Sequence, residues 1–298
     1  MSAEIATAFS RKYAAGIELT AQQLKSVLEG TIDIEPNPEG EMIFRDQVGV
    51  VRMQPKVGRA TDIPIVDTPH RRRALTPQDF EMRDFADSFD RLKVLNDPVN
   101  SYTMAGVSAG QRKKDKIIID ALLGTAYTGK AGTTPVTLPS AMQIASASTG
   151  FTFAKLQEAI RLLRRRNAIM QGEAVTVVYT SYQEKQFMNV SEVKSVDYNT
   201  QKVLVEGEVG TFYTCHFKRV EDEYDDDGTA VRMLPLTTVT RTCLVYPKSA
   251  GLLAKWKDVY GRVEWNVDRG CPQITTGMSV GCTRMQETKV VRMDVIEN

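Results

Sequence analysis

The sequence predicts an α+β fold, and three features of the chain carry that prediction. Apolar residues keep a helical spacing through residues 101–123, and helix and strand patterns alternate through about 151–190. After about residue 200, most segments are short runs rich in Val, Thr, Tyr and Phe, which are typical of strands. Helices followed by a strand-rich region indicate an α+β protein.

The bulk composition limits what such a protein can do. The 298 residues are 42% hydrophobic, enough to bury roughly 75% of the unfolded surface in one large or two modest domains. Lys and Arg number 38 against 37 Asp and Glu, so the net charge of +1 provides no long-range field, and any DNA contact should be local and weak. The N-terminal residues lack a signal-peptide core, and no run of about eighteen apolar residues occurs. We therefore expect cytoplasmic synthesis and no membrane contact.

The first 75 residues show no core of their own. A weak helical pattern ends at Gly30, which suggests an arm. Two β-like runs then occupy about 42–74, separated by a turn that contains Pro55 and Gly58. Charged residues such as Arg45 interrupt both runs, so we expect another subunit to pack on this excursion.

A helical zone is expected from Thr76 to Leu123. Thr76 followed by Pro77 is a good cap and first turn, and the first helix should stop before Pro98. The second helix, over 101–123, should be roughly 33 Å long and stop at Gly124. The Gly, Thr and Pro that follow indicate a linker over 124–140.

The rest of the chain alternates helix and strand before strands dominate. Residues 153–163 predict a helix, residues 174–180 a buried strand, and Ser181 with Glu184 a capping box that opens another helix. Several strand-like segments follow, with one short helix expected near 249–259.

The four cysteines have no CxxC spacing, so neither a zinc site nor a disulfide framework is indicated. We expect buried or half-buried reduced thiols at Cys215, Cys243, Cys271 and Cys282.

A phosphate-binding loop is suggested by Gly124, Gly129 and Lys130, which fit GxxxxGK. Ala131 stands where a Ser or Thr should hold magnesium, and Pro135 prevents the helix that should follow. An ordinary glycine turn explains the pattern better.

No other constellation for catalysis, cofactors or metals is visible. His70 and His216 are the only histidines, and there is no GxSxG, HExxH or dinucleotide fingerprint. The run 225–227 of three aspartates could suggest a cation site, but consecutive carboxylates cannot all face one ion. A solvated hairpin tip is favoured there.

Two arginine clusters remain, at Arg71, Arg72 and Arg73 and at residues 164–166. Arginine pairs with carboxylates and phosphates, so each cluster could serve a subunit contact or nucleic acid; a solvated strand rim or helix end is an equal alternative. The first cluster lies where the excursion rejoins the body. Arg71, Arg72 and Arg73 are therefore the candidate subunit-interface residues.

Two stretches of the chain resemble a known family. The run TPHRRRALTPQDFEMRDFADSFDRLKVLNDPVNSY, followed by RKKDKIIIDALLGTAYTGKAG, and the later LVYPKSAGLLAKW, GRVEWNVDRG and GCTRMQETKVV resemble tailed-bacteriophage major capsid proteins of the Hong Kong 97-like fold. The resemblance implies five segments: an N-terminal arm (1–39), an extended loop (40–75), a peripheral domain with a spine helix (76–150), an axial domain (151–261), and peripheral strands with a final axial strand (262–298).

The resemblance also implies a structural, non-enzymatic function. Pentamers and hexamers of the chain would form an icosahedral shell around double-stranded DNA, with a portal, weak DNA contact and synthesis in the host bacterial cytoplasm. The sequence lacks that family's long N-terminal scaffolding segment, so a separate scaffolding protein is expected, and no Lys and Asn environment for a crosslink is recognisable.

Two alternative functions stay open. An encapsulin-like nanocompartment would need a cargo-docking site, and none is visible. A nucleotide-dependent enzyme built on residues 124–130 would show nucleotide-dependent stabilisation.

Overall fold

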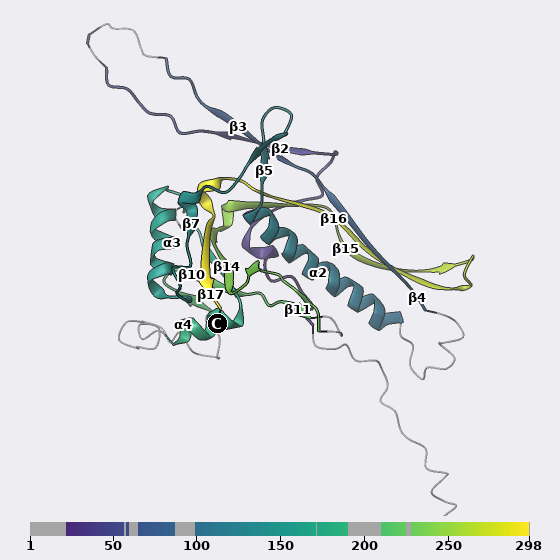
Figure 1. Cartoon of the computed structure of the whole chain (residues 1–298). Coiled ribbons are helices and arrows are strands. Elements are labelled where there is room, and N and C mark those ends of the chain that lie inside the picture. The colour runs from purple at the N-terminus through teal and green to yellow at the C-terminus, as the bar shows by residue number, and fades with distance from the viewer. Residues whose placement is uncertain are drawn as a thin grey trace, which may run out of the picture. The chain divides into compact units, whose positions relative to one another are not determined.

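The computed structural model describes residues 22–56, 58–59, 65–86, 99–170, 172–189, 210–224 and 228–297, and these confirm the α+β class (Figure 1). The chain forms two compact units. Unit 1 comprises Met1–Lys25, Asp79–Arg112 and Asp258–Met278, and unit 2 comprises Ser26–Gln78, Lys113–Lys257 and Ser279–Asn298.

A seven-stranded sheet forms the core of unit 2. Its order is β7 (Gln143–Ile144), β17 (Val291–Ile296), β14 (Thr240–Pro247), β8 (Val175–Tyr179), β10 (Cys215–Arg219) and β9 (Thr211–Phe212), with β13 (Leu236–Thr237) paired to β14. Strand β8 runs parallel to β10 and antiparallel to β14, and all five of its residues are buried. The predicted buried strand is confirmed.

Two helices pack with this sheet. Helix α3 (Phe153–Arg165) buries Leu156, Ile160 and Leu163 along one stripe, as its spacing predicts. In α4 (Ser181–Met188), the ring of Phe187 meets that of Phe212 edge to face, with centroids 5.4 Å apart.

The capping box of α4 lies one residue earlier than predicted. Thr180, not Ser181, is the N-cap, and its backbone N donates to Gln183 Oε1 at 3.1 Å. The prediction was wrong because Ser181 N is occupied elsewhere: it donates to the carboxylate of Glu221 at 2.7 Å.

The expected long helix is α2 (Val99–Leu123), which begins two residues before the predicted start. It ends where predicted, since Gly124 N closes the last turn on Asp120 O at 2.8 Å. The chain passes between the two units within this helix.

The predicted linker is instead part of a sheet. Strands β2 (Ile43–Val48), β3 (His70–Leu75), β5 (Ala126–Thr128) and β6 (Thr134–Val136) form a four-stranded antiparallel sheet. The prediction of a linker was wrong because the glycine-rich segment pairs with a strand that is distant in the sequence. In the β3–β5 pair, Arg73 lies opposite Thr128 and Ala74 lies opposite Tyr127. Gly129 and Gly132, both at positive φ, form the β5–β6 turn.

A second four-stranded sheet has the order β1 (Asp33–Pro36), β15 (Gly251–Asn266), β16 (Cys271–Arg284) and β4 (Gln78–Phe85). The helix predicted from Thr76 is therefore wrong over β4, and its remainder, 87–97, lies outside the described residues. One reason is that a proline disfavours the helical conformation in the residue before it, here Thr76. Another is that glycines in β16 allow β4 to pack closely against it. A Cβ on Gly277 would meet Phe80 O at 3.1 Å.

The short helix predicted near 249–259 is also wrong. Only a 3₁₀ turn, η4 (Lys248–Ala250), precedes β15. Leu252 and Ala254 pair with β1, and their burial in the sheet overrides local helical preference. The other described elements are η2 (Glu29–Thr31), η3 (Ser140–Met142), η5 (Glu287–Lys289), β11 (Glu223–Tyr224) and β12 (Ala230–Val231).

Strands β11 and β12 pair as a hairpin, as expected around the aspartate run, but residues 225–227 themselves lie outside the described residues. All four cysteines are free and buried or half-buried, as predicted.

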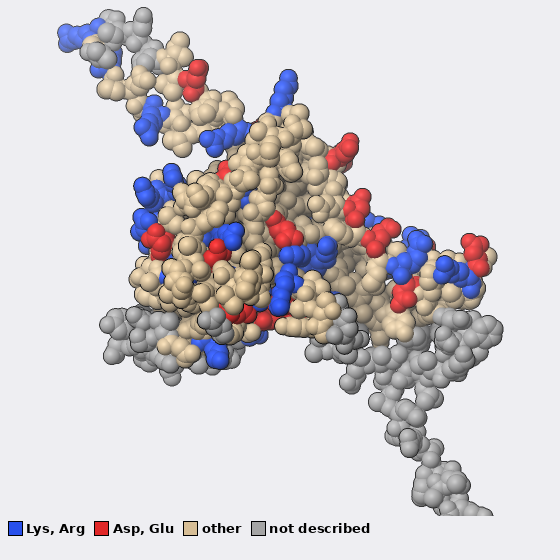
Figure 2. All heavy atoms as spheres, viewed as in Figure 1, with Lys and Arg blue, Asp and Glu red and all other residues tan. Residues whose placement is uncertain are grey.

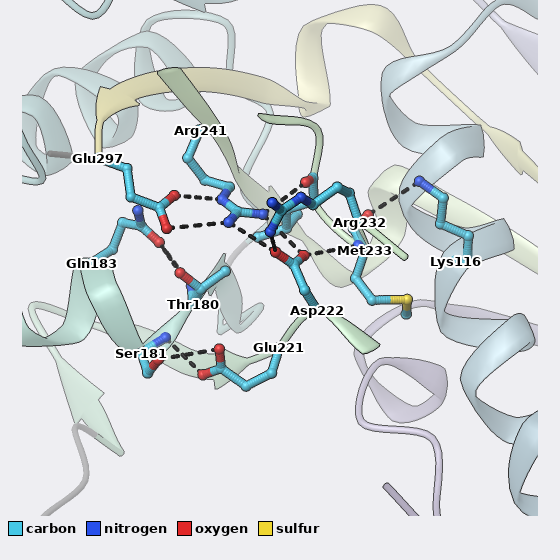
Figure 3. A network of polar contacts seen from close by, with 11 residues as sticks. Lys116, Thr180, Ser181, Gln183, Glu221, Asp222, Arg232, Met233, Arg241 and Glu297 are labelled. Atoms are coloured by element: carbon cyan, nitrogen blue, oxygen red, sulfur yellow. Dashed lines mark hydrogen bonds and ion pairs between the residues drawn. The ribbon is translucent and has the colours of Figure 1, made fainter. Parts of the chain in front are cut away.

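A buried ion-pair network in unit 2 joins β14 to residues 222 and 297 (Figure 3). Arg241 on β14 is almost fully buried and bonds both Asp222, at 2.9 Å, and Glu297, at 2.7 Å. Arg232, which is partly exposed, bonds Asp222 from outside at 2.6 Å. Burial raises the pKa of Asp222, but hydrogen bonds from Arg241 and Arg232 outweigh it, so its pKa lies below the ordinary value.

Replacing Arg241 should destabilise the fold far more than replacing Arg232. Arg241→Ala leaves two carboxylates without their shared cation, and such losses cost about 3–5 kcal/mol of unfolding free energy. Arg232→Ala removes only an exposed partner, so a much smaller loss is expected. Urea denaturation followed by circular dichroism measures both; equal losses would show that the buried network does not stabilise unit 2.

Candidate assembly surfaces

The chain beyond strands β2 and β3 exposes apolar side chains. The register pairs Val48 with His70, and Gly49 N donates to Pro69 O at 2.7 Å. Outward from there, the described residues form no regular secondary structure, although strands were predicted to continue. Val50 is 88% exposed and Ile65 94% exposed, and Met53 is fully exposed. We name residues 49–69 the distal loop.

The base of the distal loop is held firmly. Met285 O accepts hydrogen bonds from Gln47 Nε2 at 3.0 Å and from Arg73 Nε at 2.9 Å, so one carbonyl ties both β2 and β3. Arg73 also forms an ion pair with Glu287, and its side chain is 4% exposed. The strands that lead to the distal loop are therefore fixed to the segment between β16 and β17.

The neighbouring Arg284 fixes two more segments, the end of α2 and strand β6. This fully buried guanidinium donates to Leu122 O at 2.7 Å and Gly124 O at 2.8 Å from Nη1, and to Val136 O at 3.1 Å from Nη2. It thus satisfies carbonyls at the C-terminal end of α2, where a cation is also favoured by the helix dipole. Burial lowers the pKa of Arg284.

The candidate interface residues occupy three different environments. Arg72 pairs with Asp46 across the strands, with Nε and Oδ1 2.6 Å apart, and lies over the Phe44 ring. This pairing lowers the pKa of Asp46. Arg73 is buried, as described, whereas Arg71 is exposed and makes no ion pair among the described residues. That all three contact a neighbouring subunit stays a prediction.

A hollow of about 680 Å³ lies beside this base, between the edge strands β1 and β2. Arg45 bridges the two strands through Glu35, with Nη2 and Oε2 2.7 Å apart. Unpaired strand edges next to a hollow can accept another extended chain.

The second arginine cluster lies at the end of α3. Arg164, Arg165 and Arg166 are exposed, and Figure 2 shows Lys and Arg side chains gathered over this helix. The two clusters therefore differ in structure: the one chosen from the sequence as the candidate subunit interface is largely paired within the chain, and the other faces solvent.

The described residues form no phosphate-binding loop, no catalytic histidine arrangement and no metal site. Residues 129–132 form the β5–β6 turn, with β6 rather than a helix after it, so Lys130 lies in an ordinary turn. His70 and His216 stand on different sheets. No group of three or more potential metal ligands occurs in the described segments. Burial raises the pKa of Cys215 to about 12, so that thiol is a poor nucleophile.

None of the described helices is long and apolar enough to cross a membrane. The residues that sequence reasoning missed are Arg284, Met285 and Glu287. Nothing in their spacing marks them, because Arg284 donates to carbonyl groups of distant segments and Met285 accepts through its own backbone carbonyl.

The comparisons define the class of protein. The family model described as phage capsid protein matches residues 5–297, so the chain belongs to the phage capsid protein family. It is a structural component of the virion, a major capsid protein. The phage shell is favoured over the nanocompartment alternative.

Solved capsid structures carry the same fold. A structure from Mycobacterium phage Che8 matches with TM-score 0.66 and 16% identity, covering 96% of each chain. The capsid of cyanophage P-SCSP1u matches with TM-score 0.70 and 14% identity, covering 97% of this chain and 93% of that one. An acid-stable capsid of Helicobacter pylori bacteriophage KHP30 matches with TM-score 0.70 and 12% identity, covering 99% and 97%.

At these identities the structural likeness shows the fold alone. The Hong Kong 97-like capsid fold expected from the sequence is confirmed. A comparison with curated protein sequences gives no match.

Substitution of Arg73 should lower the stability of the subunit, whereas substitution of Arg71 should weaken the association between subunits. Arg73→Ala leaves Glu287 and Met285 O without their buried partner and should lower the unfolding free energy by about 3 kcal/mol. Arg71→Ala should leave stability nearly unchanged and weaken association between subunits. Thermal melting and sedimentation velocity separate the two effects; normal association of Arg71→Ala would remove Arg71 from the subunit interface.

Proposed function

We propose that copies of this chain assemble into pentamers and hexamers that form an icosahedral shell around double-stranded phage DNA. The distal loop of each copy lies over a neighbouring copy. The observation that carries this proposal is the apolar surface of Val50, Met53 and Ile65, which the chain itself leaves in water.

The length of the distal loop supports contact with a neighbour. Residues 50–68 provide two limbs that could each reach roughly 30 Å at about 3.3 Å per extended residue. Each fully buried aliphatic side chain stabilises an interface by about 1.5–3 kcal/mol. The fixed base limits the entropy that docking would cost. Apolar burial on a fixed base thus favours a specific subunit contact.

The segments of the resemblance keep their proposed roles. Residues 1–39 form the arm, 40–75 the extended loop, 76–150 and 262–286 the peripheral domain, and 151–261 with the last strand the axial domain. We further propose that a scaffolding protein and a portal take part in assembly, that contact with DNA is weak and non-specific, and that synthesis occurs in the host bacterial cytoplasm. The subunit acts without catalysis or cofactor.

Removing the distal loop should separate folding from assembly. Replacement of residues 50–68 by a short Gly and Ser turn keeps the β2–β3 pairing, so circular dichroism and melting should be nearly unchanged. Shells and rings should be absent by sedimentation and negative-stain microscopy, because the interface has lost its apolar part.

Two full-length variants provide the matched comparison. The combined substitutions Val50→Ser, Met53→Ser and Ile65→Ser should impair assembly. The control Gln54→Ser, Lys56→Ser and Asp67→Ser, on exposed residues of the same segment, should assemble normally. Intact shells from the truncated chain would show that the distal loop is not an assembly element.

A further inference from the structure

Among the described residues, Arg161 is the only arginine near the end of α3 that forms an ion pair. Arg161 holds both oxygens of Glu158, with Nε to Oε2 and Nη2 to Oε1 each 2.6 Å. Arg164, Arg165 and Arg166 make no ion pair with any described residue, and all three are exposed. Glu158 is bonded to Arg161, and its carboxylate interacts with Arg165 only at longer range, so these three positive charges form no direct ion pair within the described residues.

These charges border a hollow. A depression of about 710 Å³ is lined by residues of α3, among them Arg161, Arg164, Arg165 and the Arg161-bound Glu158, and by Tyr213 from the β9–β10 turn. Guanidinium groups three and four residues apart on a helix are neighbours, so Arg161 and Arg165 present their donors on the same face as Arg164. Because the Arg161 fork is bonded to Glu158, the planar N–H forks that the hollow offers to a ligand are those of Arg164 and Arg165.

Tyr213 adds a polar group on the other wall. Its φ of +50° is rare for a tyrosine, and its ring packs edge to face on Phe153, with centroids 5.6 Å apart. The Arg164 guanidinium lies 5.9 Å from the centroid of the Tyr213 ring. The tyrosine is 41% exposed, and tyrosine hydroxyls bond phosphate oxygens in protein–DNA complexes.

Helix capping does not account for this cluster. The carbonyls at the end of α3 already have backbone partners: Arg166 N donates to Leu162 O at 3.3 Å, and Ala168 N donates to Leu163 O at 3.0 Å. The arginine side chains are thus not needed to satisfy the helix end.

We propose that this basic hollow, lined by Arg161, Arg164, Arg165 and Tyr213 and followed directly in the chain by the exposed Arg166, binds the phosphate backbone of duplex DNA. The inference rests on the proposed function, in which the shell encloses DNA. Bidentate pairing of guanidinium with phosphate gives affinity without base contacts, so the binding is independent of sequence. Because the net charge of the chain is near zero, the protein has no long-range attraction for DNA, and contact with the genome must come from local basic surfaces such as this one.

The test measures binding of a fluorescent short duplex to unassembled full-length subunits by anisotropy, over a series of salt concentrations. Wild-type subunits should bind at low salt, with log affinity falling linearly with log salt. The combined variant Arg164→Gln, Arg165→Gln and Arg166→Gln should bind about tenfold or more weakly, with a slope shallower by about 2.7, at about 0.9 per lost phosphate contact. Single variants should each lower the slope by about 0.9.

A charge-matched control separates this surface from overall charge. The variant Lys25→Gln, Lys130→Gln and Lys218→Gln removes three exposed charges elsewhere and should keep the wild-type slope. The combined Arg-to-Lys variant at residues 164–166 keeps the charge and should keep the slope while losing part of the affinity, because the forks are gone.

Three outcomes would overturn the inference. Wild-type subunits that do not bind duplex at low salt, or an arginine variant with the wild-type slope, would each exclude DNA binding here while leaving shell assembly untouched. An arginine variant that binds duplex normally but fails to form rings would instead assign the cluster to an acidic surface of a second copy. Circular dichroism of each variant confirms that it is folded, and the single variants apply if the triple is not.

Discussion

The side chains of Val50, Met53 and Ile65 lie almost wholly in water, because no described part of the chain covers them. The structure around the base of the distal loop is consistent with their being covered by another subunit. A segment with exposed apolar residues and no core is ordered only when something covers it. The strands at the base of the distal loop must therefore fix its orientation before a neighbouring subunit binds. The carbonyl of Met285, which accepts from Gln47 and Arg73, provides that hold.

Buried cations connect segments that are distant in the sequence. Arg284 joins α2, β6 and the end of β16, and Lys155 donates to Ser146 O, Thr149 O and Asp294 O at 2.8–3.0 Å. Burial lowers the pKa of Lys155, whose partners are carbonyl groups. Such donors satisfy carbonyls that loops and helix ends leave free, which is why the cost of burying the charge is tolerated. Rigid connections of this kind suit a subunit that must keep its shape in a shell.

Local patterns in the sequence sufficed where an element buries a clear stripe or run. Helix α3, strand β8 and the end of α2 at Gly124 were all predicted, because periodicity and a glycine stop are local signals. Strand β4 and the first part of β15 were not, because pairing with distant strands decided their conformation. The glycines of β16 are the signal that could have indicated close strand packing there.

The candidate surfaces divide in the same way. The sequence located the excursion and both arginine clusters, but it could not show which of these arginines are paired within the chain. Their difference depends on partners far along the chain: Glu287 lies more than two hundred residues from Arg73. Charge runs are visible in a sequence, whereas the groups that neutralise them are not.

Amide hydrogen exchange of the distal loop, compared between free subunits and assembled shells, tests the central claim most directly. Residues 50–56 and 65–68 should exchange rapidly in free subunits, because they belong to no regular element, and should become protected in the shell. The paired strands β2 and β3 should be protected in both states. Rapid exchange of the distal loop in assembled shells would contradict the account, because it would mean that no neighbouring subunit covers it.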